Sequence, residues 1–233
     1  MTLETYDASY KLCQADLTFI SSQLAFVNGD NLTSLALNDQ SIKMLTRIDA
    51  GNANLTPLMV GTGNHIDMTD NDTLAFDNGL EGLKKSLKKE KGNKRLLAFA
   101  SRFASFQAII ADKMKMPNLA EAYFNYAISI CDEYDISGYK NSYYCFLAVL
   151  KASQGKRKEA LETLEKAKMF ISKDPITQKE DQLITFGYTG KVYGLLEDYK
   201  VSEDSYRKAF QIAKEIGTSQ LIYTAEIGIR RSS

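Results

Sequence analysis

The chain has 233 residues, of which 44% are apolar, and its 29 basic residues balance its 29 acidic ones. Three prolines, no tryptophan and abundant Ala, Leu, Lys and Glu favour helix. The three cysteines form no CxxC pair, which argues against a disulfide framework and a cysteine zinc site. No stretch approaches the ~20 apolar residues of a membrane span, and we expect a cytoplasmic protein.

The charges are placed unevenly along the chain. Residues 1–80 contain 3 basic residues and 10 acidic ones, so the remainder is correspondingly basic. Such a dipolar chain would steer a charged partner to one end, although the same distribution is also typical of ordinary surface charge.

Residues 1–93 predict diverged helical repeats. A first helix lies between Tyr10 and Phe26, where apolar residues recur with helical periodicity: Leu12, Leu17, Ile20 and Leu24. After a turn at Asn28–Asp30, a second helix carries residues at repeat spacing: Ser34, Asn38, Ser41 and Ile42. Residues 50–72 are rich in Gly, Asn, Asp and Thr, and the irregular segment 50–80 forms either an irregular repeat or a long loop.

This irregular segment also holds the residues that suggest a chemical function. His65 is the only histidine, so a Ser–His–Asp or Cys–His arrangement would need it, yet its surroundings predict a polar loop. Gly61–Gly63 lacks the spacing of a phosphate-binding loop. The acidic residues Asp67, Asp70 and Asp72 lack the Gly and Glu of a calcium-binding loop. We therefore expect no catalytic residues, no metal and no cofactor, and a protein that is not an enzyme.

A basic run follows this segment: Lys84, Lys85, Lys88, Lys89, Lys91, Lys94 and Arg95. It would attract nucleic acid or an acidic partner, but no aromatic residues alternate with it to stack on bases. The spacing is typical of a solvated helix end, where cations favour the C-terminal dipole. We interpret the run in that way and do not expect nucleic acid as a partner.

Three clearer repeats follow at 94–135, 139–174 and 182–217, each made of two helices. Each second helix has a small, a large and a small residue at spacings of four and three: Ala120, Phe124 and Ala127; Ala160, Leu164 and Ala167; Ser202, Tyr206 and Ala209. The first helices of the last two repeats carry their own sets: Tyr144, Leu147 and Ala148; Phe186, Gly190 and Tyr193. Pro117, Gly155 and Gly217 mark helix ends or turns. Residues 218–231 predict a capping helix.

These sets resemble the tetratricopeptide repeat family, in the long-repeat form found in bacterial regulatory proteins. The repeat step of 40 and 42 residues between Ala120, Ala160 and Ser202 is longer than the usual unit. Lys151 departs from the pattern, because an aromatic residue is usual there, and we expect one weakened core contact. The resemblance implies an all-α fold, an α-solenoid of stacked antiparallel helix hairpins in a right-handed superhelix, forming a single domain over residues 1–233.

In this family the first helices line a concave groove. The resemblance places these residues in that groove: Arg102, Asn141, Ser142, Phe146, Ile184, Tyr188 and Lys191. Aromatic side chains supply contact area at low entropic cost, and a cation binds a carboxylate. Phe146 has an alternative role, which is packing against the next repeat.

We therefore expect a protein-interaction scaffold that binds a peptide or a partner helix in the groove. The alternative is a ligand- or peptide-sensing regulatory domain of a bacterial signal-transduction or transcription-regulatory protein. In that case binding would change the pitch of the superhelix. A homodimer through an end repeat is a further option for the partner.

Overall fold

The computed structural model describes residues 3–27, 30–47, 72–88, 94–136, 138–217 and 219–232. The regular structure in these ranges is helical, which confirms the all-α class. The chain divides into two compact units, Met1–Met114 and Lys115–Ser233, and each is described by itself. The division falls inside the repeat predicted at 94–135, so the single array over 1–233 and its right-handed twist stay predictions.

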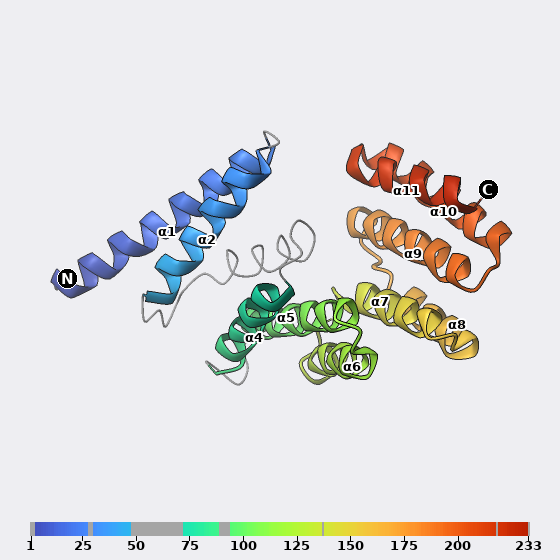
Figure 1. Ribbon diagram of the computed structural model, residues 1–233, viewed down its shortest axis with the longest axis horizontal. Coiled ribbons are helices and arrows are strands. Elements are labelled where there is room, and N and C mark those ends of the chain that lie inside the picture. The colour runs from blue at the N-terminus through green and yellow to red at the C-terminus, as the bar shows by residue number, and fades with distance from the viewer. Residues whose placement is uncertain are drawn as a thin grey trace. The chain divides into compact units, whose positions relative to one another are not determined.

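The first unit begins with a hairpin of α1 (Leu3–Val27) and α2 (Asn31–Arg47), drawn in blue in Figure 1. Small side chains let the two helices approach closely: Ala15, Ser22, Ser34 and Ser41 are all fully buried. The Ser41 hydroxyl donates to the Ala15 carbonyl over 2.8 Å. The predicted face of the second helix is therefore the one that packs on α1.

Three of the four apolar residues whose periodicity indicated the first helix are exposed, and Leu12 is half-buried. Leu17, Ile20 and Leu24 each expose more than half of their surface. Both sides of α1 repeat with helical periodicity, and the side with Ala15 and Ser22 packs against α2 because its small residues permit closer contact.

A second hairpin of the first unit joins α4 (Asp72–Lys88) to α5 (Lys94–Lys113). Gly82 of α4 lies against the buried ring of Phe103, where a Cβ atom would come within 2.3 Å of the ring. The Gln107 amide of α5 donates to the Phe76 carbonyl of α4 over 2.8 Å. Helix α4 ends at Lys88 inside the basic run, and Lys84 and Lys94 are exposed.

The segment 48–71 lies outside the described residues. It contains His65, Gly61–Gly63, Asp67 and Asp70, and Asp72 is described only as the first residue of α4. The alternatives for residues 50–80 stay open over this segment.

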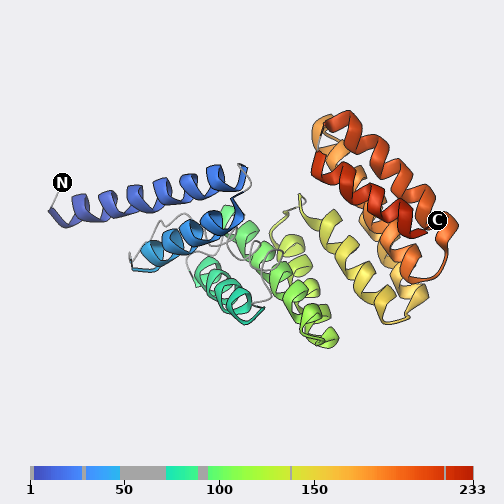
Figure 2. The same cartoon turned by 45° about the horizontal axis from the view of Figure 1, so that its top comes forward.

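The second unit consists of the remaining helices: α6 (Pro117–Glu133), α7 (Lys140–Ser153), α8 (Arg157–Lys168), α9 (Pro175–Leu195), α10 (Tyr199–Ile216) and α11 (Ser219–Ser232). Figures 1 and 2 show α7 and α8 as one hairpin and α9 and α10 as the next, with α11 beside α10. Helix α7 also contacts α9 directly, so the first helices of successive hairpins are neighbours.

Each hairpin core is completed by a residue from the helix that follows it. Ala148 of α7 and Leu164 of α8 cluster with the buried Val192 of α9. In the next hairpin, Leu183 of α9 and Ala209 of α10 cluster with Ala225 of α11. This sharing of core residues between neighbours is typical of stacked helical repeats.

The helix ends follow from local sequence signals. Pro117 and Pro175 occupy first-turn positions of α6 and α9, where the missing N–H is not needed. Gly155 and Gly217 have φ angles of 73° and 82°, which glycine adopts without strain. The last predicted repeat was expected to begin at 182, but α9 starts at Pro175 because the Asp174 side chain caps it by accepting from the Thr177 amide.

One aromatic ring sits between two glycines in the last three helices. A Cβ atom added to Gly190 of α9 would come within 2.8 Å of the Tyr206 ring of α10. A Cβ atom on Gly228 of α11 would come within 2.5 Å of the same ring. Three helices therefore meet around Tyr206 at a distance that larger residues would not allow.

Replacing Gly190 with leucine is expected to lower the free energy of unfolding by roughly 1–3 kcal/mol, because the new side chain overfills the space occupied by the Tyr206 ring. Urea denaturation followed by circular dichroism measures the change. Gly187→Leu is the matched control on the same helix, since a Cβ atom there meets nothing within 4 Å. Equal midpoints for the two variants would show that Tyr206 does not restrict position 190.

Candidate functional site

The predicted groove residues of the second unit lie on corresponding sides of α7 and α9. Ser142 and Phe146 are four residues apart on α7, and Ile184 and Tyr188 are four residues apart on α9. These four side chains are half-buried, and Lys191, one turn beyond Tyr188, is exposed. We call this set of five residues the α7–α9 face.

An aromatic pair lies at the centre of the α7–α9 face. The Phe146 and Tyr188 rings meet edge to face, with centroids 4.9 Å apart and an interplanar angle of 82°. Phe146 also lies 6.0 Å from the buried ring of Phe124 on α6. Phe146 thus packs between neighbouring helices, as its alternative role required, and keeps part of its surface exposed.

The aromatic pair gives the α7–α9 face a fixed apolar contact area. Edge-to-face rings restrain each other, so little side-chain entropy is lost when a partner covers them. Lys191 adds a flexible cation beside this area, and an ammonium group binds a carboxylate as a point charge. The arrangement can hold an apolar residue and a neighbouring carboxylate at the same time.

Asn141 was predicted as a groove residue, but it is a buried bridge between helices. Its side chain is 1% exposed, and its amide nitrogen donates to the Ala167 carbonyl of α8 and the Thr185 hydroxyl of α9, each over 2.9 Å. Its side-chain oxygen has no hydrogen-bond partner among the described residues. Asn141 therefore fixes the spacing of three helices instead of facing a ligand.

Thr185, which accepts from Asn141, also interacts with the thiol of the buried residue Cys145. Burial raises the pKa of the Cys145 thiol to about 12, although a hydrogen bond with Thr185 acts in the opposite direction. The thiol stays protonated at neutral pH and is not a nucleophile.

Arg102 is the one predicted groove residue outside the second unit. It is a half-buried residue of α5 in the first unit. Of the predicted groove residues, Phe146 and Tyr188 are in contact, and Arg102 lies in the other unit.

A shallow cavity of about 290 Å³ lies on the other side of α7. Its lining comes from α6, α7 and α8: Asn125, Ile128, Tyr144, Leu147, Lys151, Glu159, Glu162, Thr163 and Lys166. On α7 the cavity residues lie about half a helical turn around the axis from the face residues. The side chains of Tyr144, Leu147 and Lys151 therefore point away from those of Ser142 and Phe146. The cavity is therefore separate from the α7–α9 face.

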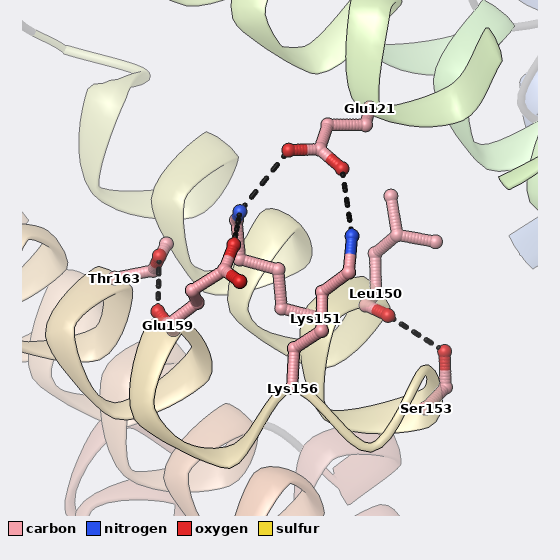
Figure 3. Close-up of polar contacts among 7 residues, drawn as sticks. All are labelled: Glu121, Leu150, Lys151, Ser153, Lys156, Glu159 and Thr163. Atoms are coloured by element: carbon pink, nitrogen blue, oxygen red, sulfur yellow. Dashed lines mark hydrogen bonds and ion pairs between the residues drawn. The ribbon is translucent and has the colours of Figure 1, made fainter. Parts of the chain in front are cut away.

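Lys151 sits at the edge of this cavity and binds two carboxylates (Figure 3). Its ammonium lies 3.0 Å from Glu121 of α6 and 2.7 Å from Glu159 of α8. Lys156 lies 3.7 Å from the second oxygen of Glu121. An ion-pair cluster therefore joins the three helices at Lys151, where an aromatic residue is usual, and the weakened core contact stays a prediction.

This cluster shifts the titration of its members. Burial disfavours the charged form of Lys151, but the hydrogen bonds to Glu159 and Glu121 outweigh burial and raise the pKa of Lys151 above its usual 10.5. The hydrogen bond from Lys151 lowers the pKa of Glu159 below its usual 4.5. Both shifts favour the ion pair at neutral pH.

In the described part of the chain, no three His, Cys, Asp or Glu side chains gather to hold a metal ion. None of its helices combines the length and the apolar character needed to cross a membrane.

No protein-family model and no curated protein sequence matches the chain. Among solved structures, a Rap protein complexed with competence and sporulation factor is similar, at 14% identity and a TM-score of 0.61. The apo form of RapI is similar at 15% identity and a TM-score of 0.64. Aspartyl phosphate phosphatase F from Bacillus subtilis is similar at 15% identity and a TM-score of 0.62.

These matches cover 95% of this chain. The chain in turn spans 64% of the complexed Rap protein, 82% of RapI and 60% of phosphatase F. At this level of identity the likeness is one of fold. The chain has the helical-repeat fold of the Rap proteins, and its tetratricopeptide resemblance is supported at the level of fold.

Replacing Lys151 with methionine is expected to lower the free energy of unfolding by roughly 1–2 kcal/mol. The variant keeps the side-chain volume but leaves Glu121, whose side chain is 26% exposed, with the more distant Lys156 alone. Lys158→Met is the control, because Lys158 is 89% exposed and its ion pair is expected to contribute nothing measurable. Equal urea midpoints for both variants would contradict a stabilising cluster.

The contribution of the cluster is expected to depend on pH. The lowered pKa of Glu159 stabilises the folded state above pH 4.5, and this stabilisation is lost as the pH falls through the folded value. The raised pKa of Lys151 stabilises the folded state below pH 10.5, and this stabilisation is lost as the pH rises through the pKa of Lys151 in the folded state. The difference in unfolding free energy between wild type and Lys151→Met should therefore shrink at both extremes. A difference that stays constant from acid to alkali would contradict the assignment.

Proposed function

We propose that the chain is a protein-interaction scaffold and that the α7–α9 face binds an extended peptide or a partner's helix. The observation that carries the proposal is the edge-to-face pair of Phe146 and Tyr188, half-buried beside the exposed cation of Lys191. Binding surfaces are typically enriched in partly exposed aromatic residues.

The dimensions of the face suit a short peptide. Neighbouring helices lie about 8–10 Å apart, and an extended chain advances about 3.3 Å per residue. A peptide that runs across the first helices of successive hairpins therefore presents about three residues to each helix. One apolar side chain on the aromatic pair and one carboxylate near Lys191 fit this spacing.

The similar structures support the proposal at the level of the fold. The Rap protein was solved in complex with competence and sporulation factor, so a protein of this fold holds a bound factor. The buried bridge from Asn141 to Ala167 and Thr185 keeps the α7–α9 face preorganised, which lowers the entropic cost of binding. We place the protein in the cytoplasm, a compartment consistent with its three free cysteines.

A regulatory, ligand-sensing role is a second candidate, and the division at Met114 favours it. Binding that alters the arrangement of two compact units would transmit the presence of a ligand. One similar structure is an aspartyl phosphate phosphatase, and that activity belongs to the neighbour. For this chain we propose binding without catalysis.

The test uses a library of synthetic extended peptides of about six residues, each with an acidic residue or a free carboxyl terminus. Peptides selected by the wild-type chain are expected to bind Lys191→Ala about threefold to tenfold more weakly, because one charge-assisted contact is lost. Fluorescence anisotropy measures the dissociation constants, and added salt should reduce the difference.

Lys200→Ala provides the matched control, because Lys200 is an exposed lysine of α10 away from the α7–α9 face. Tyr188→Ala should weaken binding further, with circular dichroism confirming that the fold is retained. Failure to select any peptide, or equal affinities for wild type and Lys191→Ala, would refute the proposed site. Small-angle scattering of the bound and free chain separates the two roles. The scaffold role predicts the same scattering profile with and without peptide, and the sensing role predicts a change in the profile.

A further inference from the structure

Helix α1 has two apolar sides, and only one of them is used by α2. Ala15 and Ser22 are buried on the side that packs on α2. The other side carries a row of residues at alternating spacings of three and four: Tyr10, Cys13, Leu17, Ile20 and Leu24. Leu3, Tyr6 and Val27 continue this spacing in the sequence. We call the row from Tyr10 to Leu24 the α1 seam.

The α1 seam is open to solvent along its whole length. Tyr10, Leu17, Ile20 and Leu24 are 56%, 58%, 52% and 60% exposed, and Cys13 is exposed as well. A single exposed leucine is ordinary on a protein surface. Five such residues in a continuous row are unusual and mark an interaction surface.

The alternating spacing identifies the kind of partner. Residues at spacings of three and four form the a and d positions of a coiled coil, where each side chain packs between residues of a facing helix. A pocket for one residue would not require this alternation. A helix with the same periodicity fits the row, and α1 itself provides such a helix.

We propose that the α1 seam packs against the α1 seam of a second copy of this chain, forming a dimer through the first unit. The flanking positions favour pairing of like with like. Ser9, Gln14, Ser21 and Gln23 are uncharged, and Asp16 is the one charge among the five residues beside the seam. Two copies therefore meet without opposing rows of like charge, and no row of charge selects a different, oppositely charged helix.

The size of the seam meets the requirement of a weak but specific dimer. From Tyr10 to Leu24 the helix advances about 21 Å. Covering this row on two copies would remove on the order of 1,000 Å² of surface from water, the lower bound for a specific interface. Short isolated coiled coils are unstable because their helices must form when they pair. Helix α1 already packs against α2, so pairing does not carry this cost.

Sedimentation of the full chain tests the proposal. The wild-type chain is expected to shift with concentration from 26.1 kDa to twice that mass. Leu17→Glu places a charge in the seam and should raise the dimer dissociation constant at least about tenfold. Leu32→Glu is the matched control, since Leu32 is an 82% exposed leucine of α2 outside the seam. Both leucines are exposed, so neither variant disturbs a core.

Cys13 supplies a second measurement on the unmodified chain. Cys131 and Cys145 are buried, so a water-soluble maleimide should label Cys13 first. The labelling rate of Cys13 should fall as the wild-type concentration rises and should stay constant for Leu17→Glu. A chain that remains monomeric at every concentration would overturn the proposal. So would a wild-type dimer that Leu17→Glu leaves intact.

Discussion

A helical hairpin cannot cover its own core, and the second unit is organised by that constraint. Val192 of α9 completes the cluster of Ala148 and Leu164, and Ala225 of α11 completes the cluster of Leu183 and Ala209. Each hairpin therefore depends on the helix that follows it, so the stability of one hairpin includes a term from its neighbour. The packing that closes each core also brings the first helices together and creates the surface on which binding is proposed.

Polar contacts add precision to this apolar packing. Asn141 reaches two neighbouring helices with one amide group, and Lys151 reaches two neighbouring helices with one ammonium group. The first contact lies in the first turn of α7 and the second in its last turn, so the two contacts hold opposite ends of the helix. A buried polar group that loses its partner destabilises the folded state. The two sets of contacts therefore restrict how successive helices can slide past one another.

Much of the second unit could be predicted from sequence, because its signals are local. The spacing of Ala160, Leu164 and Ala167 and the turn at Gly155 depend on residues within one hairpin. The bridging roles of Asn141 and Lys151 were missed, because their partners lie up to 44 residues away. Periodicity alone does not decide which side of α1 is buried, because both of its sides repeat with the same period and closeness to α2 decides between them. The cap at Asp174 was a readable signal, an Asp directly before a Pro.

The ring of Tyr206 lies against Gly190 of α9 and Gly228 of α11, so three positions on three helices share one volume. A change at any one of them alters what the other two can accept. Related sequences are therefore expected to vary at these positions in concert, with a smaller residue at 206 wherever either glycine has been replaced. Covariation of this kind would connect successive repeats even where their individual motifs have diverged beyond recognition.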